Sequence, residues 1–146
     1  MIAIGSDHGG FDLKQAIMEH LTEIGVEFKD FGTYDKSSCD YPDIAKVTCE
    51  AVRDGECEKA ILLCGTGIGI SMAANKVKGI RAACCSDYYS AKYTRLHNDA
   101  NALCMGGRVV GFGLAIEMVD VFLNTKFEGG RHQNRVDKIT AIENER

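Results

Sequence analysis

The sequence has a single proline, and none of its apolar runs approaches the length that a membrane-spanning helix requires. Such a helix needs roughly 18 consecutive apolar residues. The opening residues, MIAIGSDHGG, also lack the basic start and the long apolar core of a secretory signal. These absences predict a cytoplasmic protein with no membrane partner.

An excess of positive charge is missing as well. The chain has 17 Lys and Arg against 21 Asp and Glu, which gives a net charge of -4 and a pI near 5.5. Because a dedicated nucleic-acid binder usually carries a basic patch, no nucleic-acid partner is expected. The length of 146 residues and the 45% hydrophobic composition suit one domain, residues 1–146, with a substantial core.

The sequence has no CxxC pair and no His/Cys cluster at zinc spacing, although it has seven cysteines. Their number is odd and most lie within apolar runs, so reduced thiols are expected rather than a disulfide scaffold. A thiol-redox function and a metal site are therefore not expected. Six of these cysteines read as ordinary core or surface residues, and Cys64 is the exception.

Short apolar runs alternate with longer helical patterns along the chain. The apolar runs predict strands at 1–6, 26–32, 59–64, 79–84 and 101–106. Helices are expected near 11–24, 44–53, 68–77, 88–97, 113–125 and about 131–146. The helical stripes expected to face the core are Leu13, Ile17, Leu21 and Ile24 in the first helix, and Leu114, Met118 and Phe122 in the fifth. This alternation predicts an α/β fold in which helices cover both faces of a five-stranded parallel sheet.

Polar residues and glycines follow four of the five predicted strands. In an open parallel sheet, ligands collect outside the carboxyl ends of the strands. We therefore expect a site at this edge, although turns from strand to helix also need glycine. The segments concerned are 7–10, 64–69, 86–87 and 106–108.

The segment CGTGIG at 64–69 is the most informative of these. It is not the GxGxxG of dinucleotide binding, and it lacks the lysine of a P-loop. Closely spaced glycines that open a helix expose backbone N–H groups to an anion. A helix N-terminus also stabilises the thiolate form of a cysteine. From the residues alone, a reactive Cys64 and a buried cysteine that closes a strand remain alternatives.

Four further residues are candidate site residues when they are taken together, although each of them alone reads as an ordinary surface residue. His97 ends a predicted helix, and His8 sits beside a carboxylate that can orient its ring. Arg131 and Arg135 are four residues apart and share one helical face, which suits a phosphate group.

Taken together, the motifs resemble the B-type ribose-5-phosphate isomerases, which are grouped with galactose-6-phosphate and allose-6-phosphate isomerases. The resemblance spans essentially the whole chain and includes the spaced arginines Arg131 and Arg135. Its ordered motifs are GSDHGG at 5–10, DYPD at 40–43, CGTGIG at 64–69, AANK at 73–76, RLHNDAN at 95–101 and GGRVVG at 106–111. It implies a Rossmann-like three-layer sandwich and a homodimer or dimer of dimers, with no metal and no cofactor.

The resemblance also implies how a phosphosugar substrate would be converted. Cys64 would be the base that moves a proton between C2 and C1, and His97, helped by Asp7, would open the furanose ring. The backbone of 65–69 would form an anion hole for the enediolate. One branch of the family has a glutamate base where this chain has Ile70, so the chain resembles the cysteine branch.

Further site residues follow from the same resemblance. They are Gly65, Thr66, Gly67, Ile68 and Gly69 in the glycine loop, Asn98 beside the substrate hydroxyls, Tyr41 lining the pocket, and His8, Arg108, Arg131 and Arg135 at the phosphate and substrate. Active sites would lie between subunits, with the helix at about 131–146 packed on the partner. A six-carbon sugar phosphate as substrate and a non-catalytic sugar-phosphate-binding module remain alternatives.

Overall fold

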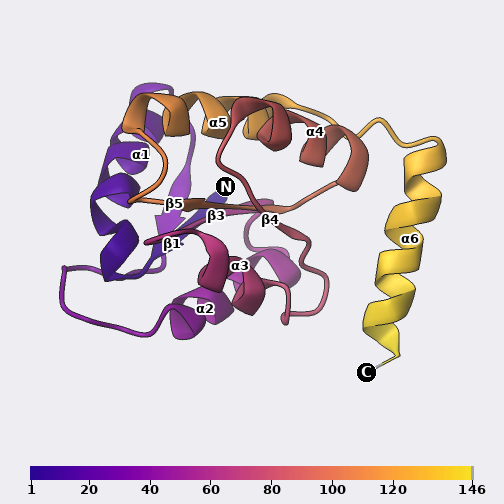
Figure 1. Cartoon of the computed structure of the whole chain (residues 1–146), viewed down its shortest axis with the longest axis horizontal. Coiled ribbons are helices and arrows are strands. Elements are labelled where there is room, and N and C mark those ends of the chain that lie inside the picture. The colour runs from indigo at the N-terminus through magenta and orange to yellow at the C-terminus, as the bar shows by residue number, and fades with distance from the viewer. Residues whose placement is uncertain (146) are drawn as a thin grey trace.

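The computed structural model describes residues 1–145 and has a central parallel sheet between two layers of helices (Figure 1). The strands pair in the order β2-β1-β3-β5-β4, all parallel. Their bounds are β1 Ile2–Ser6, β2 Phe28–Asp30, β3 Lys59–Cys64, β4 Ala82–Cys84 and β5 Ala102–Gly106. The predicted α/β fold with a five-stranded parallel sheet is confirmed.

Six α-helices cover the sheet or flank it (Figure 1). One apolar cluster joins α1, α4 and α5 to one face, and a second joins α2 and α3 to the other. The central strands are buried on both faces, as the near-continuous apolar runs predicted. The bounds are α1 Phe11–Glu23, α2 Tyr41–Arg53, α3 Ile68–Ala74, α4 Tyr88–Asn98, α5 Phe112–Asn124 and α6 Arg131–Asn144, and a short 3-10 turn spans His8–Gly10.

Several details differ from the sequence-based expectation. Helix α2 begins at Tyr41 rather than near residue 44, because Pro42 occupies its first turn, where a missing N–H costs nothing. Ile24 lies just beyond the end of α1 and is 48% exposed, so the predicted stripe ends at Leu21. Leu114 is likewise exposed, at the start of α5.

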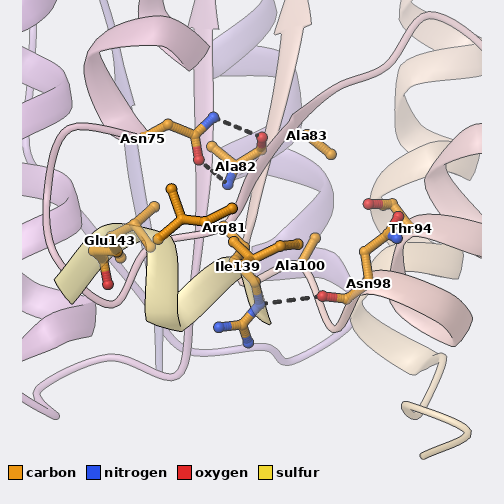
Figure 2. Close-up of a pocket in the computed structure, with 11 residues that line it drawn as sticks. Asn75, Arg81, Ala82, Ala83, Thr94, Asn98, Ala100, Ile139 and Glu143 are labelled. Carbon is orange, nitrogen blue, oxygen red and sulfur yellow. Dashed lines mark hydrogen bonds between the residues drawn. The ribbon is translucent and has the colours of Figure 1, made fainter. Parts of the chain in front are cut away.

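Helix α6 stands beside the sandwich rather than covering the sheet (Figure 1). Its main packing is against α4, and Val136 is its one buried side chain among residues 131–144. A cavity of about 420 Å³ separates α6 from the start of β4 and is lined by Ile139, Ile142 and Glu143 of the helix (Figure 2). Within residues 1–145, no helix has the length and apolar character to cross a membrane. Residue 146, the last of the predicted helix, lies outside the described residues.

Candidate active site

Cys64 is the last residue of β3, and its thiol faces the turn that opens α3. The Sγ atom accepts a hydrogen bond from the backbone N–H of Gly67 at 3.1 Å. The residue is 5% exposed, so the sulfur is shielded but lies at the rim of the sheet. This bond places the sulfur directly beside the backbone donors of the glycine loop. The position fits a base.

The backbone of the CGTGIG loop is held in a conformation that a side chain would prevent. Gly67 has φ +81°, in the left-handed region that favours glycine. A Cβ atom at Gly67 would lie 2.8 Å from the carbonyl carbon of Met105. The loop therefore lies directly against the end of β5, and its N–H groups stay beside the Cys64 sulfur.

Two predicted side chains border this loop. The Arg108 guanidinium lies over Gly65, where a Cβ atom would be 3.1 Å from Nη1. The Tyr41 ring packs against Gly69, where a Cβ atom would come within 2.7 Å of the ring. A cation and an aromatic wall thus stand at either end of the glycine loop. This arrangement suits a polar ligand with a negative group.

The turn after β1 contributes the neighbouring wall. The Asp7 carboxylate accepts hydrogen bonds from the N–H groups of Gly9 and Gly10 at 2.9 and 3.1 Å. His8 Nδ1 accepts from the backbone N–H of Cys39 at 3.2 Å, so the neutral ring carries its proton on Nε2. His8 therefore keeps one donor for a ligand while its other nitrogen is occupied.

Five of the other six cysteines are poorer candidates for a base. All seven cysteines are free thiols. Burial raises the pKa of Cys49 to about 12 and that of Cys85 to about 11. Burial also raises the pKa of Cys57, Cys84 and Cys104. These thiols stay protonated near neutral pH and cannot readily accept a proton.

His97 lies near the amino ends of the strands, whereas Cys64 lies at their carboxyl ends. Helix α4 begins after the carboxyl end of β4 and ends just before the amino end of β5. Its 11 residues cover about 16 Å. Cys64 instead pairs with Gly106, at the carboxyl end of β5. Within a single chain, the predicted ring-opening residue is therefore not close to the predicted base. Asp7 lies at the carboxyl ends of the strands, like Cys64, and does not reach His97.

Two residues that the sequence did not single out surround His97. Its ring stacks on His132, with centroids 4.2 Å apart and planes 12° from parallel. A Glu128 carboxylate oxygen lies 3.9 Å from His97 Nε2 and 3.4 Å from His132 Nε2. Glu128 and His132 are spaced at i and i+4 beside Arg131, and this spacing is the sequence signal that could have indicated them as site residues.

These three side chains also form a grouping that could hold a metal, with ligand atoms within 4.8 Å of one another. The imidazole planes are nearly parallel, so the nitrogen lone pairs run side by side rather than toward one point. A metal would require both rings to turn.

The other predicted residues share the α4 and α6 side. Asn98 ends α4 and lines the cavity beneath α6, where its carbonyl accepts from Arg81 (Figure 2). Arg131 and Arg135 are both exposed on the first turns of α6. The predicted site residues thus divide into two groups, one around Cys64 and one around His97.

Known proteins resemble the chain over nearly its full length. A family model described as Ribose/Galactose Isomerase matches residues 2–139. Ribose-5-phosphate isomerase B of Escherichia coli (strain K12) is 54% identical over 145 residues, covering 99% of this chain and 97% of that protein. The solved structure of ribose-5-phosphate isomerase B from Clostridium thermocellum matches with a TM-score of 0.97 at 54% identity, covering 99% and 97% of the two chains. That of the Mycoplasma genitalium enzyme with bound ribulose-5-phosphate matches with a TM-score of 0.93 at 44% identity, covering 99% and 97%.

Proposed function

Because the chain belongs to the ribose/galactose isomerase family, we propose that it interconverts ribose 5-phosphate and ribulose 5-phosphate through an enediolate. The observation that carries this proposal is the Cys64 sulfur, 3.1 Å from an N–H of a glycine loop. A relative 54% identical over nearly the whole chain is a ribose-5-phosphate isomerase B. A structural neighbour holds ribulose-5-phosphate. Both support a five-carbon substrate.

The reaction needs a base beside fixed donors for negative charge. Cys64 as thiolate takes the C2 proton of the open-chain aldose, and the electron pair moves onto O1 to give an enediolate. The thiol then returns the proton to C1, while a proton leaves O2 and another adds to O1. Backbone N–H groups of residues 65–69 would meet the oxyanion, and such a donor typically contributes about 2.7–4 kcal/mol. Only protons move, so the chemistry requires no redox cofactor.

We further propose a homodimer, or a dimer of dimers, whose active sites are shared. His97, Arg131 and Arg135 of one copy would complete the active site around Cys64 of the other copy. Exposed apolar side chains support this pairing: Ile68 and Met72 on α3, and Ile139 and Ile142 on α6, are all more than one-third exposed. Together they offer two apolar faces that a second copy can cover, one of them beside Cys64.

The phosphate would then be held mainly by arginines. Arg131 and Arg135 are exposed on one helical face, and Arg108 lies over the glycine loop. Guanidinium groups bind phosphate with paired hydrogen bonds. We place the enzyme in the cytoplasm, because its proposed base must stay reduced and all seven cysteines are free thiols.

Proton exchange tests the proposal directly. Ribose 5-phosphate is incubated with the protein in deuterated water, and the C2 proton signal and the product are followed by NMR. Cys64→Ala should abolish both exchange and conversion, whereas Cys84→Ala, a nearby exposed thiol, should keep them. Exchange that survives in Cys64→Ala would reject this base. Binding without exchange would favour a non-catalytic module, and a higher kcat/KM on allose or galactose 6-phosphate would favour a six-carbon substrate.

A further inference from the structure

The ring of His97 is held by an aromatic stack on the surface of α4. His132 lies face to face with it at 4.2 Å between centroids. Tyr93, one turn earlier in α4, meets it edge-on at 5.1 Å. The His97 side chain is 41% exposed and that of His132 only 12%. The inner imidazole therefore supports the outer one, which stays open to a ligand.

The segment that carries His132 is fastened to α4 by buried contacts. Arg95 is 7% exposed and donates from Nε to the carbonyl of Thr125 at 3.1 Å. The backbone N–H of Glu128 donates to the carbonyl of Leu96 at 3.1 Å, one residue before His97. Arg95 Nη1 also donates to the carboxylate of Asp99 and to the carbonyl of Ala100, just after α4, so one buried guanidinium holds both segments.

Two glycines then turn the chain back toward α4. Gly129 and Gly130 have φ +68° and +56°, and α6 starts directly after them. This turn places His132, in the first turn of α6, over the His97 ring. The Glu128 carboxylate lies beside the Nε2 atoms of both imidazoles. These contacts join segments that are some 30 residues apart in the sequence, and together they hold the exposed imidazole of His97.

We infer that His132 and Glu128 are positioning residues for His97 in furanose ring opening. The inference rests on the proposed function, in which His97 opens the ring. Opening removes the proton of the hydroxyl on C1, breaks the C1–O4 bond and delivers a proton to O4. An imidazole that does this must present Nε2 in a fixed direction. The His132 face fixes the plane of the ring, and the Glu128 carboxylate oxygen, 3.9 Å from Nε2, restricts the direction in which that nitrogen points.

The test separates ring opening from proton transfer at carbon. Conversion of ribose 5-phosphate starts from the furanose. Exchange of the C1 hydrogen of ribulose 5-phosphate in deuterated water needs only the base and the enediolate, since the phosphate on O5 prevents this ketose from closing a furanose ring. A variant that harms only ring opening should lower the first rate and leave the second unchanged.

His132→Ala and Glu128→Gln should lower kcat/KM for ribose 5-phosphate by about tenfold or more, with C1 exchange within about twofold of wild type. His97→Asn should give the same pattern. His132→Phe, which keeps an aromatic face on His97, should retain more activity than His132→Ala. His20→Gln is the matched control, because His20 forms a separate pair with Asp120 at 2.7 Å and should change neither rate.

Equal losses in both assays would overturn the inference, because they would mean that the variants disturb the whole site or the neighbouring arginines. Unchanged rates in both assays would overturn it as well. A wild-type protein inactive in both assays would instead refute the proposed function. A selective loss in His97→Asn without one in His132→Ala or Glu128→Gln would leave the proposed function intact and reject the positioning roles.

Discussion

Cys64 and His97 lie at opposite ends of the strands of one parallel sheet. Cys64 is at the carboxyl end of β3, and His97 lies just before the amino end of β5. The proposed base and the proposed ring-opening residue therefore cannot belong to one pocket within one chain. The proposed homodimer would bring them together, since each copy would supply His97 to the Cys64 of the other.

Mixing two impaired variants should therefore restore conversion of ribose 5-phosphate. Cys64→Ala is expected to be inactive and His97→Asn to convert ribose 5-phosphate much more slowly than wild type, while a mixed dimer contains one site with both wild-type residues. After subunit exchange of equal amounts, about a quarter of wild-type turnover should return, because half of the dimers are mixed and each has one intact site. A mixture that stays as impaired as the separate variants although mass spectrometry shows mixed dimers would contradict shared sites.

Gly67→Ala should disrupt the glycine loop. Alanine at φ +81° is strained by roughly 1–2 kcal/mol, and its Cβ would also clash with the Met105 backbone at 2.8 Å. Turnover should fall by about a hundredfold, because the N–H donors shift. Gly55→Ala is the control, since Gly55 has φ +84° and no atom within 4 Å of the added Cβ. Equal losses of turnover in the two variants would mean that the loop conformation is not needed.

Unfolding free energy should fall above pH 9. The unfolded Cys49 thiol ionises near 9.0, whereas burial raises the native pKa to about 12. Between these values the native state binds more protons than the unfolded state, so stability decreases as pH rises, by up to about 1.4 kcal/mol per pH unit for each such thiol. Urea unfolding at pH 8 to 10.5 measures this, and Cys49→Ala should flatten the dependence. A variant curve parallel to that of wild type would exclude Cys49.

Lys14→Met should destabilise the fold. The Lys14 ammonium is fully buried and donates to Asp30 at 2.7 Å and to the carbonyl of Thr33 at 2.6 Å. Removing it leaves the partly buried Asp30 carboxylate and the Thr33 carbonyl without their cation, at a cost of about 3 kcal/mol in unfolding free energy. Lys29→Met removes an exposed pair with Glu56 and should leave the urea midpoint nearly unchanged. Similar midpoints for the two variants would show that burial does not strengthen the Lys14 pair.

Local pattern was enough to predict the sheet, because its central strands are near-continuous apolar runs that are followed by polar residues and glycines. The end of α1 was harder to place. Gly25 adopts φ +73° and stops the helix before Ile24 can turn inward, so a periodic stripe extended one residue too far.

Contacts between distant segments could not be read from the sequence. Cys64 stood out because its glycine loop follows it directly in the chain. The contact between His97 and His132 depends on the packing of segments some 35 residues apart, and on the buried side chain of Arg95. The periodicity of apolar residues along the sequence gives no information on such a contact.

Helix α6 has 14 residues and buries only Val136, so its own chain contributes little to keeping it folded. Isolated helices of this length are marginal in water. In the proposed homodimer a second copy covers the apolar side of α6, so the backbone amides of this helix should exchange slowly with solvent. They should exchange rapidly after dilution separates the two copies. Hydrogen exchange in this one helix would report the fraction of molecules that are associated.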